Sequence, residues 1–321
     1  MSSKLKVFIV GATGITGQSI AHGLLAKPEQ FDLHVLARSA SIAKPELSDL
    51  TKLGATLQAV DLDGTVDAVA ELLAGADVVI SCLTLLQFDQ EIKLVSAAKQ
   101  AGVGRYVPSF FGPVAPPNPD VLFLRAKKEE ILLHAKSLYL PYTVIDIGWW
   151  YQMVAPRPPS EAADPDAFVQ PMPIIGDGDV KIGLTDNRDI GSVVAKVIAD
   201  KLTINRSVFF FGEVATLSEV WKVVEEVSGV TINDRISSQS IIDTVNKFPR
   251  EKGMTSEAAM AHYYYTLAVR GDNIPEKARY LGYLDARELY PDLQRRPWKE
   301  YVEDLVAGKL ASPYSGRGRI L

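Results

Sequence analysis

The stretch VFIVGATGITG at residues 7–17 decides the fold of this 321-residue chain. Residues 7–10 form an uninterrupted apolar run, as in a strand buried on both faces, and Gly11 ends that run. From Ile15 onward, apolar residues recur at helical spacing through residue 25. The pattern therefore predicts a strand, a glycine turn and a helix. Backbone N–H groups at such a turn point outward at the positive end of the helix dipole, which suits a phosphate group.

Apolar runs and helix-length segments alternate along the first half of the chain. The runs that read as strands are residues 7–10, 34–37, 57–60, 77–81, 105–109 and 142–148. Strands that alternate with helices favour right-handed crossovers and a parallel sheet covered on both faces. We therefore expect an α/β fold with a doubly wound parallel sheet, the Rossmann arrangement, and a nucleotide-binding domain over residues 1–153.

Residues 154–321 are predicted to form a smaller, mostly helical substrate lobe. A segment rich in proline and acidic residues, 155–173, opens this part and reads as an irregular excursion. Helices are predicted at 189–201, 216–229, 238–248 and 256–271, and one more strand at 208–212. We expect residues 189–212 to return to the sheet.

The composition argues against several classes of ligand and site. The formal charge of −5 argues against a general binder of nucleic acid or of anionic membranes. Cys82 is the single cysteine, and the four histidines are far apart, so neither an intrachain disulfide nor a metal site is expected. The chain also has no run of about 18 apolar residues. We expect a soluble cytoplasmic protein with a small-molecule ligand, and a homodimer is compatible with such a chain.

The spacing of the first glycines resembles a known superfamily. GxxGxxG resembles the motif of the short-chain dehydrogenases/reductases, and its form GATGITG resembles the NmrA-like and isoflavone-reductase-like branch, which includes phenylcoumaran benzylic ether and pinoresinol-lariciresinol reductases. The stretches RYVPSFFGP at 105–113 and LPYTVIDIG at 140–148 resemble further landmarks of that branch. The resemblance implies a dinucleotide bound at the turn by Gly11, Thr13, Gly14, Ile15, Thr16 and Gly17.

The end of the second strand indicates which dinucleotide binds. NAD-preferring sites carry an acidic residue there, whereas an arginine accommodates the 2′-phosphate of NADP. This chain has Arg38 and no acidic residue until Glu46, and a guanidinium can hold a phosphate through two hydrogen bonds. We infer NADP(H), with Lys44 as a second phosphate contact. The alternative for Arg38 is a solvated loop residue.

Four further residues are cofactor contacts by resemblance to the superfamily. Asp61 would face the adenine, Leu83 and Thr84 would lie along the adenosine and ribose, and Ser109 would supply a hydroxyl beside the nicotinamide. All four follow predicted strands, so ordinary turn and strand-end roles stay open for them.

The usual catalytic motif of the superfamily is absent, because none of the twelve tyrosines has a lysine four residues later. The branch that this chain resembles uses instead one lysine, thirteen residues before the proline of its I-P-Y-T strand. Counting back from Pro141 identifies Lys128, with Lys127 as the alternative if the register differs by one. A partly desolvated ammonium beside a nicotinamide would have a lowered pKa and could exchange a proton near neutral pH. Both lysines could also belong to a solvated, salt-bridged helix face.

Aromatic residues are the candidates for substrate contacts. Trp149, Trp150 and Tyr151 follow the sixth strand, where open α/β sheets bind ligands, and Tyr264 lies on a predicted lobe helix. Phe110 stands where the branch has the glutamate of P-S-E-F-G, which puts the mechanism and substrate of the plant enzymes in doubt. Packing of the lobe against the sheet is the alternative role for these rings.

Three functions are compatible with these motifs. The first is an NADPH-dependent reductase of an aromatic or conjugated small molecule, with Lys128 handling the proton. The second is an NmrA-like regulator that senses NADP(H) and acts through protein contacts without turnover. The third is an isomerase or lyase on the same cofactor scaffold. A functional lysine and an aromatic pocket favour the reductase, because a sensor needs neither.

Overall fold

The computed structural model describes residues 4–156, 171–231, 234–248 and 255–310. Five parallel strands form the first part of the central sheet in the order β3-β2-β1-β4-β5. Their bounds are Leu5–Val10 for β1, Phe31–Ala37 for β2, Thr56–Ala59 for β3, Val78–Ser81 for β4 and Arg105–Val107 for β5. The order reverses between β1 and β4, as in a doubly wound sheet.

The sheet continues beyond β5 through strands from later in the chain. A parallel bridge between Tyr106 and Tyr142 joins β5 to β6 (Thr143–Asp146). Parallel pairing then adds β10 (Arg206–Phe209) and β13 (Leu284–Asp285). The predicted doubly wound parallel sheet is therefore confirmed.

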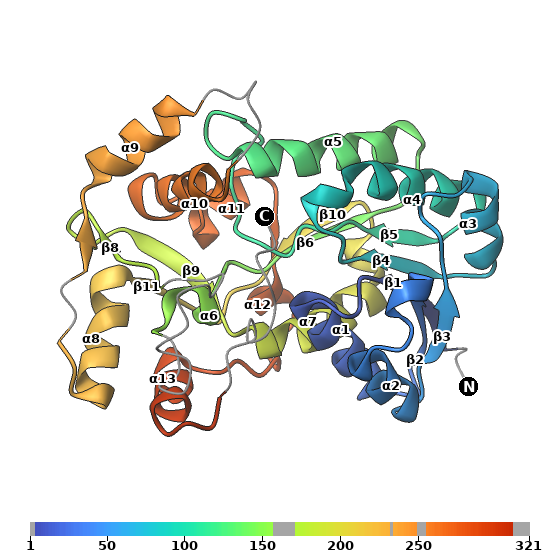
Figure 1. The fold of residues 1–321 in the computed structure, drawn as a ribbon, viewed down its shortest axis with the longest axis horizontal. Coiled ribbons are helices and arrows are strands. Elements are labelled where there is room, and N and C mark those ends of the chain that lie inside the picture. Colours follow the sequence, from blue (N-terminus) through green and yellow to red (C-terminus); the bar gives the residue numbers. More distant parts are fainter. Residues whose placement is uncertain (1–3, 157–170, 232–233, 249–254, 311–321) are drawn as a thin grey trace.

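Helices cover both faces of this sheet (Figure 1). One face carries α1 (Ile15–Leu25), α2 (Pro45–Lys52) and α7 (Ile190–Ala199), and the other carries α3 (Val66–Leu72), α4 (Phe88–Gln100) and α5 (Phe123–Ser137). Helices α1 and α7 touch so closely that a Cβ on Gly191 would lie 1.9 Å from the Ser19 carbonyl oxygen. Helix α7, which follows β9, thus packs directly on the first half of the sheet.

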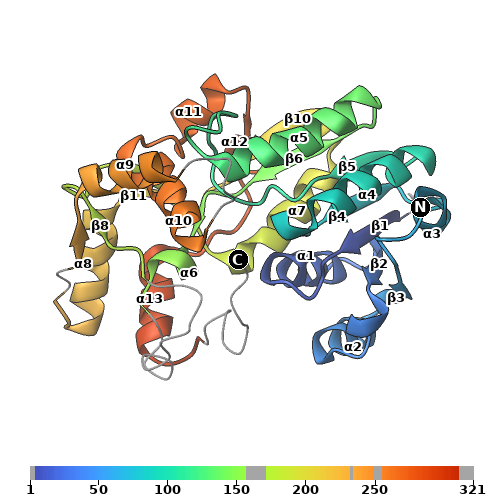
Figure 2. The same ribbon diagram turned by 45° about the horizontal axis from the view of Figure 1, so that its top comes forward.

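The remaining elements build a lobe beside the carboxyl ends of the strands (Figures 1 and 2). It contains α6 (Tyr151–Val154), α8 (Leu217–Ser228), α9 (Ser238–Lys247), α10 (Ser256–Tyr264) and α13 (Trp298–Val306), while α11 (Pro275–Tyr280) and α12 (Ala286–Leu289) flank β13. Helix α8 begins with a capping box between Thr216 and Glu219, and it ends at Gly229 in the left-handed conformation. Both ends agree with the sequence-based prediction.

The lobe has more β-structure than the sequence indicates. Strands β7 (Trp149–Trp150), β9 (Lys181–Thr185) and β11 (Glu213–Thr216) form one small sheet, and β8 (Ile174–Ile175) pairs with β12 (Arg235–Ile236). These strands are too short for their sequences to show a clear alternation of apolar and polar residues. The predicted helix at 256–271 also differs, because α10 is followed by one π-helical turn at Tyr265–Val269. The prediction of an irregular excursion at 155–173 falls largely on 157–170, outside the described residues.

Within the described part of the chain, no helix combines the length and apolar character needed to cross a membrane.

Candidate functional site

The turn between β1 and α1 has the geometry that a bound phosphate requires. Gly11 adopts φ +85°, and a Cβ there would lie 2.6 Å from the Cys82 carbonyl oxygen. A Cβ on Gly17 would lie 2.3 Å from the Gly11 carbonyl oxygen. Gly14 precedes the helix without a side-chain cap, so the N–H groups of the first turn of α1 stay available. The turn can therefore exist only with glycine at positions 11 and 17.

A cavity of about 300 Å³ begins at this turn and runs past the carboxyl ends of β1, β4 and β5. This is the place where the strand order reverses and where ligands of open α/β sheets bind. Among the predicted cofactor and substrate residues, those that line the cavity are Gly14, Ile15, Thr16, Gly17, Leu83, Thr84, Ser109, Phe110, Lys128, Trp149 and Trp150.

The other predicted cofactor residues lie outside this cavity, after β1, β2 and β3. Arg38 directly follows β2 and is exposed, and Lys44 is exposed just before α2. Asp61 is exposed beyond β3, where a side-chain oxygen accepts the N–H of Asp63 at 3.0 Å. Thr13 lies within the glycine turn itself. Because the strands are parallel, Arg38 and Asp61 stand at the same edge of the sheet as the turn.

Lys128 is the ionisable residue at the far end of the cavity. It lies in the second turn of α5 and is half-buried, and its Nζ donates a hydrogen bond to the Phe110 carbonyl oxygen at 2.6 Å. Burial lowers the pKa of Lys128 from 10.5 to about 8, although Asp146 opposes part of that effect. Lys127 has different surroundings, because it forms an ion pair with Glu130 at 2.9 Å on the exposed face of α5.

Sequence reasoning missed Glu91, a carboxyl group buried beside the cavity. Only 2% of Glu91 is exposed, and its Oε1 accepts the Ser109 N–H at 3.0 Å and the Tyr106 hydroxyl at 3.3 Å. Burial raises the pKa of Glu91, and the charge of Lys128 lowers it. Glu91 therefore anchors the segment that carries Ser109 and acts electrostatically on the lysine.

A signal for Glu91 is present in the sequence. Glu91 occupies the same helix stripe as Leu94, Val95 and Ala98, which are all buried in α4. A charged residue on an apolar stripe is unusual, because a buried carboxyl group needs polar partners.

Sequence reasoning also missed a buried ion pair behind Phe110. Arg125 donates to Asp146 at 2.6 Å, and the Tyr283 hydroxyl donates to the same carboxylate oxygen at 2.6 Å. The Arg125 guanidinium lies 4.5 Å from the centroid of the Phe110 ring. This pair fixes the ring that stands where the resembling branch has a glutamate, and its two charges act in opposite directions on the pKa of Lys128.

Two of the aromatic residues predicted to contact the substrate do not line the cavity. Tyr151 is fully buried in the lobe, where its ring contacts Trp298 and Tyr301, and its hydroxyl donates to the Arg296 carbonyl oxygen at 3.0 Å. Helix α6 begins at Tyr151 and turns this ring away from the cavity. Tyr264 is partly buried against the core of the lobe and is not among the residues that line the cavity.

The neighbouring Tyr263, and not Tyr264, is the tyrosine of α10 that lines the cavity. It lines the cavity, and its ring centroid lies 5.0 Å from that of Trp149. Successive side chains of a helix point about 100° apart, so two neighbouring residues face different surroundings. The buried indole N–H of Trp149 has no hydrogen-bond partner among the described residues.

Comparison with known protein families and sequences identifies relatives of this chain. The model of the NmrA-like family matches residues 3–302. An asnovolin J 5′,6′-dehydrogenase of Aspergillus novofumigatus is 38% identical, over 96% of this chain and 97% of that protein. The phenylcoumaran benzylic ether reductase TP7 of Nicotiana tabacum is 27% identical, over 95% of this chain and 100% of that protein.

Solved structures share the fold. The complex of leucoanthocyanidin reductase with NADPH from Vitis vinifera superimposes with a TM-score of 0.77, at 24% identity, over 94% of this chain and 99% of that chain. The named relatives are oxidoreductases that match nearly the full chain, which supports a reductase or dehydrogenase role.

Proposed function

This chain belongs to the NmrA-like family, and from that premise we propose that it is an NADP(H)-dependent oxidoreductase acting on an aromatic or conjugated small molecule. One observation carries the proposal. A single cavity connects a glycine turn shaped for a phosphate with a half-buried lysine whose pKa is about 8.

The residues present fit a dinucleotide. The pyrophosphate would meet the N–H groups at the start of α1, because glycine at 11 and 17 lets the backbone pack where a side chain would collide. Arg38 would hold a 2′-phosphate from the end of β2, and Leu83, Thr84 and Ser109 would contact the nucleoside parts. NADPH supplies a hydride when it is bound.

Lys128 would supply the proton that accompanies hydride transfer. With a pKa of about 8, most Lys128 side chains are protonated at pH 7. The protonated side chain nevertheless gives up its proton more easily than an ordinary lysine does. During reduction, the Nζ would protonate the substrate atom that accumulates negative charge and then recover a proton from water. During oxidation, the neutral amine would accept that proton.

The substrate end of the cavity favours a flat ligand. Phe110, Trp149 and Tyr263 line it with aromatic rings, which contribute apolar contact area. An aromatic or conjugated compound meets this requirement.

The test begins with binding of NADPH and NADH by calorimetry, followed by an NADPH-oxidation screen against aromatic enones, flavonoid-like compounds and benzylic ethers. We expect turnover by the wild type and a fall of about 10²- to 10⁴-fold in kcat for Lys128→Met. Lys127→Met is the matched control, because Lys127 lies on the exposed face of α5.

Two results would contradict the proposal. Full turnover by a folded, NADPH-binding Lys128→Met variant would remove the lysine from the chemistry. Tight NADPH binding without turnover across the panel would favour the NADP(H)-sensing regulator instead.

A further inference from the structure

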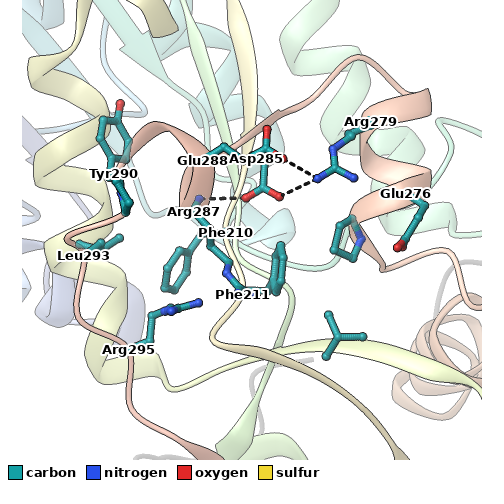
Figure 3. Close-up of a pocket in the computed structure, with 13 residues that line it drawn as sticks. Phe210, Phe211, Glu276, Arg279, Asp285, Arg287, Glu288, Tyr290, Leu293 and Arg295 are labelled. Carbon is teal, nitrogen blue, oxygen red and sulfur yellow. Dashed lines mark hydrogen bonds and ion pairs between the residues drawn. The ribbon is translucent and has the colours of Figure 1, made fainter.

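A second and larger cavity, of about 520 Å³, lies next to the carboxyl ends of β10 and β13 (Figure 3). Its walls come from Phe210 and Phe211 after β10, from α11, and from the segment between β13 and Arg295. It shares no lining residue with the cavity that contains Lys128. This second cavity is therefore separate from the site of the proposed reaction.

Three arginines line this second cavity, and one of them is neutralised. Arg279 in α11 forms ion pairs with Asp285 at 3.5 Å and with Glu288 at 2.6 Å (Figure 3). Glu276 on the same helix adds a further negative charge near Arg279. The acidic residues of the cavity are thus grouped around a single guanidinium.

Arg287 and Arg295 are in a different situation. Among the described residues, no carboxylate lies within ion-pair distance of either guanidinium, and no acceptor is hydrogen-bonded to either one. The Arg287 guanidinium is stacked 4.7 Å from the centroid of the Phe211 ring, which holds it in place. Figure 3 shows Arg295 extending toward the same space, near Phe210.

The two guanidinium groups are close enough to repel each other. Burial lowers the pKa of Arg287, and the charge of Arg295 lowers it further, while Asp285 offsets only part of the effect. An anion placed between the two guanidinium groups would relieve this repulsion. Guanidinium groups are also the donors that match the two oxygens of a carboxylate or a phosphate.

We propose that this cavity binds a small molecule through one oxyanion group, a phosphate or a carboxylate, held between Arg287 and Arg295. The volume suits a ligand of metabolite size. Glu276 and Glu288 at the exposed side would repel a second negative charge, so the site selects molecules with a single oxyanion.

The experiment titrates inorganic phosphate and, separately, benzoate into the whole protein by calorimetry, in the presence of saturating NADP⁺. The dinucleotide covers the glycine turn, which would otherwise bind phosphate as well. The variants are Arg287→Gln and Arg295→Gln. Arg206→Gln is the control of equal charge, because Arg206 is exposed at the opposite end of β10.

We expect the affinity for the better probe to fall at least about tenfold in each cavity variant and to stay unchanged in Arg206→Gln. Stronger binding of phosphate or of benzoate would identify which oxyanion the site prefers. Equal affinity in all four proteins, or no binding of either probe to the wild type at about 50 mM, would overturn the proposal. Arg295 is exposed, so its variant keeps the test valid even if Arg287→Gln fails to fold.

Discussion

The pKa of Lys128 makes a sharp prediction about stability. Replacing this residue by methionine removes the charge and keeps most of the side-chain volume. The folded protein holds the pKa near 8, whereas the ordinary value is 10.5. The difference of about 2.5 pKa units corresponds to about 3 kcal/mol, because each unit is equivalent to about 1.4 kcal/mol. The charged ammonium therefore costs stability at neutral pH.

The direction in which the free energy of unfolding changes with pH follows from proton binding in the folded and unfolded chains. Below pH 8 both the folded and the unfolded chain bind the proton, so the full cost is present. Between pH 8 and 10.5 only the unfolded chain binds it, so the wild type gains stability as the pH rises. The variant lacks this group. Relative to Lys128→Met, the wild type should gain about 2.5 kcal/mol in free energy of unfolding between pH 7 and pH 10.

Urea unfolding of the wild type and the variant at pH 7, 8, 9 and 10 measures this difference. The packing that methionine keeps or loses sets a constant offset between the two proteins, whereas the change of that offset with pH reports the pKa of Lys128. Lys127→Met provides the control, since a surface substitution should change stability by only about 0.5 kcal/mol. A wild-type minus variant difference that is constant from pH 7 to pH 10 would refute the lowered pKa.

Three further predictions concern the same site. In the direction of reduction, kcat should fall as the pH rises through about 8, because Lys128 must carry the proton that it donates; a flat pH profile for the chemical step would argue against this role. Arg38→Ala should weaken NADPH binding by about 10- to 100-fold and leave NADH binding unchanged by calorimetry, whereas an equal effect on both would assign Arg38 to the loop alone. Asp146→Asn should lower the free energy of unfolding by about 1.5–3 kcal/mol, because it removes the buried carboxylate that Arg125 and Tyr283 share and leaves Arg125 with Glu129 as its carboxylate partner, while the exposed control Asp49→Asn should cost less than about 1 kcal/mol in the same urea titration.

Much of the fold was predictable because its signals are local. The apolar run before Gly11, the alternation of strands with helices, and the cap and stop of α8 at Thr216 and Gly229 all lie in neighbouring residues. Backbone geometry converts such patterns into strands and helices with periods of 2 and 3.6 residues. Lys128 has a different basis, because its candidacy came from the spacing to Pro141 that the resembling branch uses.

The tertiary structure alone decided which side chains meet. Arg125 finds Asp146 and Tyr283 across 21 and 158 positions of sequence, and no local pattern encodes such a pairing. Tyr263 lines the cavity and the adjacent Tyr264 does not, because the orientation of α10 within the lobe sets which of its side chains faces the cavity.

The sequence by itself therefore determined the sheet and the glycine turn, since these depend on backbone preferences within short segments, whereas the choice of Lys128 came from the resemblance to the isoflavone-reductase-like branch. The lowered pKa of Lys128, the buried Glu91 and the two facing arginines depend instead on how much water and which charges surround each group. Those surroundings are built from distant segments, so they exist only once the chain has folded.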